Sequence, residues 1–298
     1  MPLVPISQLV DDARRGRYAL GYFESWNLES LAGVIDAAEK TASPIIIGFN
    51  GDFLSRPDRR AAERLAWYGA LGRQAAETAS VPCGLIFNEC PRDEWVKEAC
   101  GLGFNLVMPA DPDAPAEDYV RRVREIVAHA RPLGVAVEAE LGELPSGESG
   151  EIVQHGAQPT DPEAGAEFVA RTGVDLLAVS VGNIHIRVDG ESPLDLERLE
   201  AIHRRVPVPL VLHGGTGIAA DSLKSALALG VVKVNYGTYL KQRYLESVRR
   251  HWPQEAVSPH ELLGIGSERD LLVAGRLAVR DAVLERMDLL GCCGRARL

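Results

Sequence analysis

The stretch VPLVLHGGTGIAADSLKSALALGVVKVNYGTYLK, residues 208–241, contains two short apolar runs, each followed by a glycine-containing turn and a helix-like segment. The apolar runs, residues 208–213 and 231–235, have the length and β-branched composition of buried strands. Residues 222–229 and 238–251 have the pattern of amphipathic helices. This stretch therefore predicts two consecutive strand–helix units, which are the building blocks of a parallel sheet.

The same alternation extends over most of the chain. Six further strands are predicted at residues 18–23, 44–49, 82–88, 104–108, 135–141 and 174–180. Further helices are predicted at residues 28–40, 59–79, 116–131 and 194–205. Eight strands, most of them followed by a helix, favour a (β/α)8 TIM barrel, and the length of 298 residues suits one barrel of about 250 residues with an extension. We expect a single domain over residues 1–298, with extra C-terminal helices from about residue 258. A doubly wound open sheet is the alternative, but no G-x-G-x-x-G motif follows the first strand.

Composition narrows the possible partners. Lys and Arg number 32 and Asp and Glu 42, so the net charge is −10, which argues against nucleic acid or an anionic membrane as the main partner. No apolar run approaches the roughly 20 residues that a membrane span needs. The N-terminal residues lack the pattern of a secretory signal, and the five cysteines form no C-x-x-C motif. We therefore expect a cytoplasmic protein with reduced thiols.

Ionisable side chains gather where the predicted strands end, which is the end of a TIM barrel that carries the active site. His185 follows the sixth strand, and His213 ends the seventh. Together with one carboxylate they would form the two-histidine, one-carboxylate site of a catalytic zinc ion. The third ligand is left open among three glutamates: Glu89, Glu138 and Glu140.

Two adjacent turns have the composition of a phosphate site. Glycines let backbone N–H groups approach a phosphate closely, and the N-terminus of a helix favours negative charge. Loops after the seventh and eighth strands bind phosphate in many barrels. The residues that we expect to bind a phosphorylated substrate are Gly214, Gly215, Thr216, Gly217, Asn235, Gly237 and Thr238.

Longer motifs around these residues resemble the class II, metal-dependent ketose-bisphosphate aldolase family, which includes the fructose- and tagatose-bisphosphate aldolases. The motifs are VEAELG at 137–142, LAVSVG at 177–182 leading to His185, LVLHGGTG at 210–217 and KVNYGTYLK at 233–241. Asn27-Leu-Glu29 and the Cys-Gly-Arg sequence near the C-terminus are weaker matches. The resemblance implies a TIM barrel in a homodimer or homotetramer, with zinc or another divalent metal, and with a monovalent cation near the phosphate. It also implies that His185 and His213 are metal ligands, and that the substrate is a phosphorylated ketose with a half like dihydroxyacetone phosphate.

The sequence departs from that family at the end of the third strand. There the family has an Asp-His-His or Asp-His-Cys triplet, whose aspartate transfers a proton and whose first histidine binds zinc. Here the triplet is Asn88-Glu89-Cys90. An amide cannot transfer a proton near neutral pH, whereas a glutamate can bind zinc, so the predicted metal site is His185, His213 and Glu89.

The group that replaces the aspartate is left open by the sequence. The candidates are Glu24, Glu138, Glu140, and Cys90 if the metal lowers its pKa, while Asn88 is counted among the catalytic residues by its position alone. Glu138 and Glu140 have an alternative role in orienting a metal ligand. We therefore predict a metal-dependent aldolase-type lyase with a divergent substrate. The alternatives are a repurposed or inactive homologue that binds a sugar phosphate, and a Schiff-base aldolase that uses Lys233.

Overall fold

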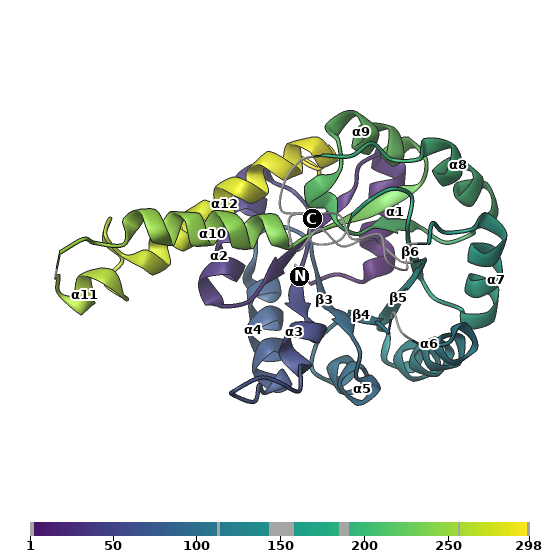
Figure 1. Ribbon diagram of the computed structural model, residues 1–298, viewed down its shortest axis with the longest axis horizontal. Helices are drawn as coiled ribbons and strands as arrows, with labels where there is room; N and C mark the ends of the chain where they lie inside the picture. Colours follow the sequence, from purple (N-terminus) through teal and green to yellow (C-terminus); the bar gives the residue numbers. More distant parts are fainter. Residues whose placement is uncertain (1–2, 112–113, 143–157, 185–190, 256, 297–298) are drawn as a thin grey trace.

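Eight parallel strands form a closed barrel in the computed structural model, which describes residues 3–111, 114–142, 158–184, 191–255 and 257–296. The strands follow one another in sequence order, and β8 pairs with β1 to close the barrel (Figure 1). Each strand begins and ends within two residues of the range that the sequence predicts. The strands are β1 Leu20–Ser25, β2 Ile45–Asn50, β3 Cys83–Cys90, β4 Leu106–Pro109, β5 Ala136–Leu141, β6 Leu176–Val179, β7 Leu210–Leu212 and β8 Val231–Tyr236. The TIM barrel is thus confirmed, and the open-sheet alternative is wrong.

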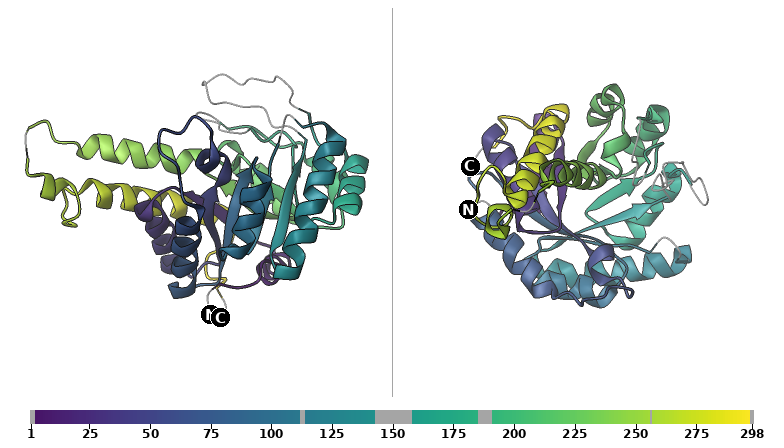
Figure 2. Two further views of the ribbon diagram at one scale, coloured as in Figure 1. Left: turned by 90° about the horizontal axis from the view of Figure 1, so that it is seen from below. Right: turned by 60° about the vertical axis from the view of Figure 1, so that its left-hand side comes forward.

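Helices surround the barrel and cover its outer face (Figure 2). Six of them match predicted helices: α2 Leu28–Thr41, α4 Leu65–Thr78, α6 Ala116–Ala130, α8 Leu196–Arg205, α9 Ala220–Ala228 and α10 Thr238–His251. The prediction was wrong for residues 59–64, because α4 begins only at Leu65. It also lacked four helices: α1 Ile6–Gly16, α3 Gly51–Ser55, α5 Asp93–Gly101 and α7 Pro162–Thr172. Two short 3-10 turns complete this part, η1 Arg131–Leu133 and η2 Gly215–Gly217.

The two faces of the strands have different environments. On β1 and β8, Phe23 and Tyr236 stack with their ring centroids 5.2 Å apart. Successive side chains of a strand point to opposite faces, so Tyr22 and Asn235 lie on the other face. That other face is the barrel interior, because Lys233 of β8 reaches Glu138 of β5, a strand that is not its neighbour. On these strands the polar side chains therefore point into the barrel interior, and the aromatic rings of Phe23 and Tyr236 point toward the helix layer.

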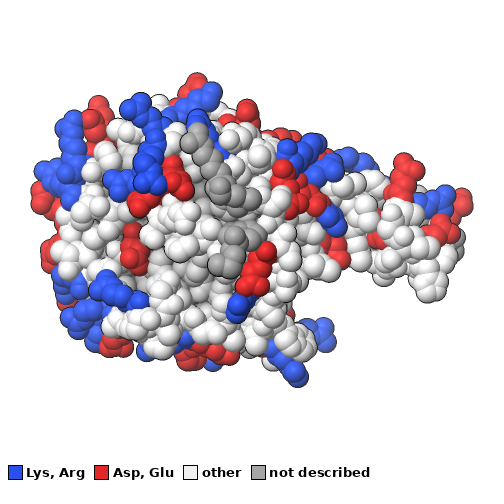
Figure 3. All heavy atoms as spheres, turned by 180° about the vertical axis from the view of Figure 1, so that it is seen from behind, with Lys and Arg blue, Asp and Glu red and all other residues white. Residues whose placement is uncertain are grey.

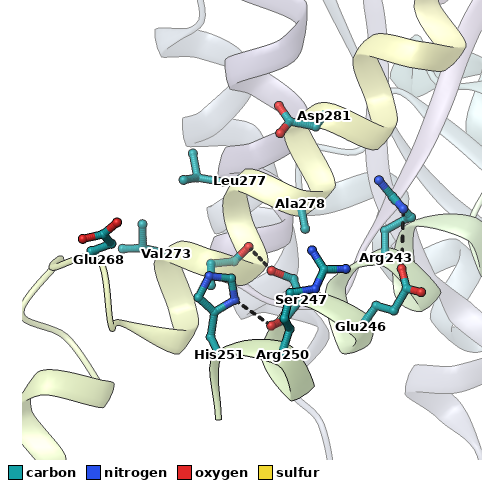
Figure 4. A pocket seen from close by; sticks show the side chains of 11 residues that line it. Arg243, Glu246, Ser247, Arg250, His251, Glu268, Val273, Leu277, Ala278 and Asp281 are labelled. Carbon is teal, nitrogen blue, oxygen red and sulfur yellow. Dashed lines mark hydrogen bonds and ion pairs between the residues drawn. The ribbon is translucent and has the colours of Figure 1, made fainter. Parts of the chain in front are cut away.

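The C-terminal helices form an arm that projects from the barrel. α10 and α12 Leu271–Leu290 run side by side, with α11 Pro259–Leu262 at the far end (Figures 1 and 2). Ser247 Oγ donates a hydrogen bond to the Ala274 carbonyl at 2.9 Å, and His251 Nδ1 lies 2.8 Å from the Ser247 carbonyl. A cavity of about 300 Å³ lies between these two helices (Figure 4). The predicted C-terminal helices are thus present.

Charged side chains of both signs lie mainly around the margin of the face seen in Figure 3 and along the arm, and the described residues near the centre of that face are mostly uncharged. Acidic and basic side chains lie next to one another there, and the described residues visible on that face form no continuous basic patch. Among the helices that the structure describes, none is long and apolar enough to cross a membrane.

Candidate active site

His213, a buried histidine directly after β7, is the centre of the candidate site. Its Nε2 lies 3.0 Å from Oε1 of Glu138, and both side chains are almost completely buried. Because β6 separates β5 from β7 in the barrel, these two side chains meet through the interior. His213 therefore has one ring nitrogen bound to a carboxylate, and its other nitrogen is turned toward the remaining inward-facing residues.

Two more carboxylates lie near that second nitrogen. The Nδ1 atom of His213 is 3.3 Å from Glu89 Oε1 and 3.5 Å from Glu140 Oε2. Nδ1 is buried, and among the described residues it has no hydrogen-bond partner. Burial alone would lower the pKa of His213, but the Glu140, Glu138 and Glu89 carboxylates outweigh it and raise the pKa to about 10. We call Glu89, Glu138, Glu140, His213 and Lys233 the His213 cluster.

Glu89 reaches the cluster through an irregularity in β3. The register with β4 shifts between Phe87 and Cys90, and Glu89 has a φ of 51°, in the left-handed region. A non-glycine residue in this region costs about 1–3 kcal/mol, and such strain is typical of functional sites. Asn50, at the end of β2, donates a 2.8 Å hydrogen bond from Nδ2 to Glu89 Oε2. The Asn50 Oδ1 accepts from the backbone N–H of Phe53, which fixes the orientation of the amide.

The free ring nitrogen of His213 and the neighbouring carboxylates fit one side of a divalent metal site. A histidine that binds a metal usually has its other ring nitrogen hydrogen-bonded to a carboxylate, as Glu138 is placed to do for His213. The buried Nδ1 and the carboxylates of Glu89 and Glu140 are ligand types that zinc accepts. No group of three or more such side chains among the described residues is arranged to hold a metal by itself. His185, the other predicted ligand, lies outside the described residues.

Lys233 of β8 links Glu138 of β5 to Asn235 on its own strand. Its Nζ lies 2.8 Å and 3.0 Å from the two oxygens of Glu138, and it donates a 2.6 Å hydrogen bond to Asn235 Oδ1. Burial would raise the pKa of Glu138, but the Lys233 ammonium and His213 hold it below its ordinary value. Lys233 is completely buried and bound on both sides, so the structure gives no support to the Schiff-base alternative.

The two predicted phosphate turns lie against each other. A Cβ atom on Gly215, in η2, would come within 2.9 Å of the Asn235 carbonyl oxygen, so only glycine allows this approach. Asn183, after β6, donates a 3.0 Å hydrogen bond to the His213 carbonyl, which holds the start of the turn. Gly214, Thr216 and Gly217 belong to or border η2, whereas Gly237 and Thr238 begin α10. The helix N-terminus has no side-chain cap.

The remaining candidates differ in how they face the site. Asn88 is buried, and its Oδ1 has no hydrogen-bond partner among the described residues. Glu24 forms a 2.5 Å ion pair with Lys241. Cys90 is buried at the end of β3. Its thiol donates to the Arg92 carbonyl, and burial raises the pKa of Cys90 to about 11, so it is protonated at neutral pH.

Comparison with known proteins gives the family. Residues 4–295 match the family model described as fructose-bisphosphate aldolase class-II. This chain belongs to the class II fructose-bisphosphate aldolase family. It is 34% identical over 294 residues, 99% of each chain, to the uncharacterized protein YdjI of Escherichia coli. It is 31% identical over 301 residues to the fructose-bisphosphate aldolase of Geobacillus stearothermophilus, again over 99% of each chain. The crystal structure of the YdjI aldolase superposes with a TM-score of 0.81 at 33% identity, over 99% of this chain and all of the other.

Several residues of this class II aldolase family member were not assigned a site role from the sequence. The sequence predicts no site role for Asn50, Asn183 or Tyr22, and it assigns Lys233 only to the Schiff-base alternative. Asn50 ends a predicted strand, so its position could have identified it. Counting alternate positions along the first and eighth strands would have placed Tyr22 with Lys233 and Asn235.

Proposed function

We propose that this class II aldolase family member is a metal-dependent lyase that cleaves or forms a C–C bond in a phosphorylated ketose. One observation carries the proposal: the buried Nδ1 of His213 faces two carboxylates while Glu138 occupies the opposite ring nitrogen. This arrangement suits a metal ligand and is difficult to explain as ordinary core packing, because gathering several carboxylates in a barrel interior is costly unless they are paired or coordinate a metal.

The metal would be held by His213 and Glu89 together with His185. When bound, zinc or another divalent ion supplies Lewis-acid polarisation of a carbonyl oxygen. Lys233 and Glu138 hold Asn235 and His213 in fixed orientations, so little reorganisation is needed when substrate binds. The N–H groups of the η2 turn and of the first turn of α10 would bind the phosphate of the ketose half. A monovalent cation near that phosphate belongs to the same proposal.

Cleavage requires a group that takes the proton from the hydroxyl on the departing carbon. Glu138 is completely buried and bound to Lys233, and Glu24 is bound to Lys241. Glu140 is one-quarter exposed, and its Oε1 has no hydrogen-bond partner among the described residues. We therefore assign the proton transfer to Glu140 in this proposal.

The aldehyde half of the substrate is expected to differ from that of a fructose-bisphosphate aldolase. Asn88 occupies the position at which the family has its proton-transferring aspartate, and it provides an uncharged amide there. The turns that would hold the other half keep the family pattern. A substrate that joins a dihydroxyacetone-phosphate-like half to a different aldehyde explains why one part of the site keeps the family pattern and the other part does not.

The experiment is an aldol assay. Enzyme reconstituted with Zn²⁺ is mixed with dihydroxyacetone phosphate and a panel of aldehydes, and product is followed by mass spectrometry. The proposal predicts at least one product, whose formation stops when a chelator removes the metal. A protein that binds dihydroxyacetone phosphate but turns over no aldehyde would instead support the second candidate, a homologue that binds a sugar phosphate without catalysis. The amide at Asn88 favours this second candidate.

We also propose that the chain is a cytoplasmic homodimer or homotetramer. The arm exposes several large apolar side chains, among them Trp252, Leu263 and Ile265, each more than half exposed. A second copy of the chain would cover such residues. Light scattering on the purified protein tests this, and a monomer at micromolar concentration would contradict it.

A further inference from the structure

Tyr22 is a completely buried tyrosine of β1 that the proposed mechanism does not use. It is 1% exposed, and its hydroxyl has no hydrogen-bond partner among the described residues. A buried tyrosine usually finds a partner for its hydroxyl, because leaving it unsatisfied is costly. An unsatisfied hydroxyl inside a barrel that carries a candidate site therefore needs an explanation.

Its position places it within the site. Tyr22 and Asn235 are Cα partners in the β1–β8 ladder, and both face the interior. The Lys233 ammonium lies 5.3 Å from the centroid of the Tyr22 ring. Burial and the carboxylates of Glu24, Glu89 and Glu138 all raise the pKa of Tyr22 well above its ordinary value. The hydroxyl is consequently protonated at neutral pH and able to donate a hydrogen bond.

The side-chain amide of Asn235 provides a second unsatisfied donor beside the Tyr22 hydroxyl. Lys233 has only donors, so the atom of Asn235 that it contacts at 2.6 Å is an acceptor, which fixes Oδ1 on that side. The Nδ2 group is then turned away from Lys233, is buried, and has no hydrogen-bond partner among the described residues. Two unsatisfied donors therefore lie on adjacent strands, facing the same interior.

We infer that Tyr22 is a substrate-contacting residue whose hydroxyl, together with Asn235 Nδ2, donates hydrogen bonds to one oxygen-bearing group of the bound ligand. The group is an acceptor oxygen, either a hydroxyl or carbonyl oxygen of the ketose half or an oxygen of its phosphate. This inference rests on the proposed function for the identity of the ligand. It adds a specificity-determining residue on β1, a strand that carries none of the residues predicted to bind the phosphate.

The test uses Tyr22→Phe, which removes only the hydroxyl. Tyr236→Phe is the matched control, because Tyr236 is equally buried, its hydroxyl also has no partner among the described residues, and it lies on the outward face of the adjacent strand. Binding of dihydroxyacetone phosphate to each zinc-reconstituted protein is measured by calorimetry. Thermal unfolding is measured with and without this ligand.

Tyr22→Phe is expected to weaken binding by about tenfold, whereas Tyr236→Phe leaves it unchanged. The Tm of ligand-free Tyr22→Phe should equal or exceed that of the wild type, because no internal hydrogen bond is lost, and the ligand should raise its Tm less. A lowered Tm with wild-type affinity would show a structural role and overturn the inference, as would equal affinity at an unchanged Tm. Failure of the wild type to bind dihydroxyacetone phosphate would overturn the proposed function. It would also overturn the assignment of Tyr22 as a contact for this ligand.

Discussion

Glu138 Oε1 lies 3.0 Å from His213 Nε2, and the same oxygen lies 3.0 Å from the Lys233 ammonium. One buried carboxylate therefore orients both the proposed metal ligand and, through Lys233, the Asn235 amide. The two parts of the proposed substrate site are coupled through this single side chain. Removing its charge should affect stability and metal binding together.

Glu138→Gln tests this coupling. The variant leaves the Lys233 ammonium buried without its counter-ion, which should lower the free energy of unfolding by about 3–5 kcal/mol. Loss of the carboxylate that orients His213 should weaken zinc binding by about 10- to 100-fold. Chemical denaturation and a competition assay with a zinc-binding dye measure the two effects. Glu246→Gln, which breaks an exposed pair with Arg243, is the control and should change stability by less than ~1 kcal/mol. Unchanged zinc affinity in Glu138→Gln would argue against the orienting role.

The pKa of His213 predicts how the stability of the metal-free protein depends on pH. The folded-state pKa, about 10, lies above the ordinary value of 6.5, so the folded state binds the proton more tightly than the unfolded state does. This contribution to stability is complete below pH 6.5 and is lost as the pH rises toward 10. Denaturation of metal-free protein at several pH values should show this fall, and His213→Gln should lack it. Parallel curves for the two proteins would mean that His213 is not held as an imidazolium.

The fold could be predicted almost completely from the sequence, because buried parallel strands are continuous apolar runs that are visible without any long-range information. The helices were harder to predict. α5 is a short helix of mixed composition, and α7 follows a polar, glycine-rich stretch in which periodicity gives no signal. Its Asp161-Pro162 start is nevertheless a recognisable cap.

The site could be predicted only in part. His213 and Glu89 were identifiable because each lies at the end of a predicted strand, and the structure brings them together. The environment of the Cys90 thiol could not be predicted, since it depends on which way the irregular end of β3 turns each side chain. The role of Lys233 was also hidden, because its partner lies 95 residues away in the sequence. Such pairings depend on which strands face each other across the closed barrel.

Glu140→Gln tests the assignment of the proton transfer. Removing a general base typically lowers kcat by about 10²- to 10⁴-fold, and metal content should remain near that of the wild type. The assay is turnover of whichever aldehyde the wild-type enzyme accepts. Glu24→Gln provides the comparison, and its loss should be much smaller, because the Glu24 carboxylate is held by Lys241. A larger loss in Glu24→Gln than in Glu140→Gln would transfer the assignment to Glu24.

Asn88→Asp introduces a carboxylate at the position of the family's proton-transferring aspartate. If the surrounding site is otherwise competent, cleavage of fructose 1,6-bisphosphate should rise by at least ~100-fold over the wild type. A coupled assay for triose phosphate release measures the rate. Asn88→Ala is the control for the loss of the amide alone. Equal rates in Asn88→Asp and the wild type would show that further changes near Asn88 exclude this substrate.

The most direct test of the account is the metal content of the purified protein, measured by elemental mass spectrometry after reconstitution with Zn²⁺ and removal of excess ion. The measurement is made on the wild type, His213→Ala and Glu89→Ala, with circular dichroism to establish that each variant is folded. The account predicts about one ion per chain in the wild type and a large loss in both folded variants. A wild-type protein that retains no divalent metal, or variants that retain all of it, would contradict the proposal that His213 and Glu89 form a metal site.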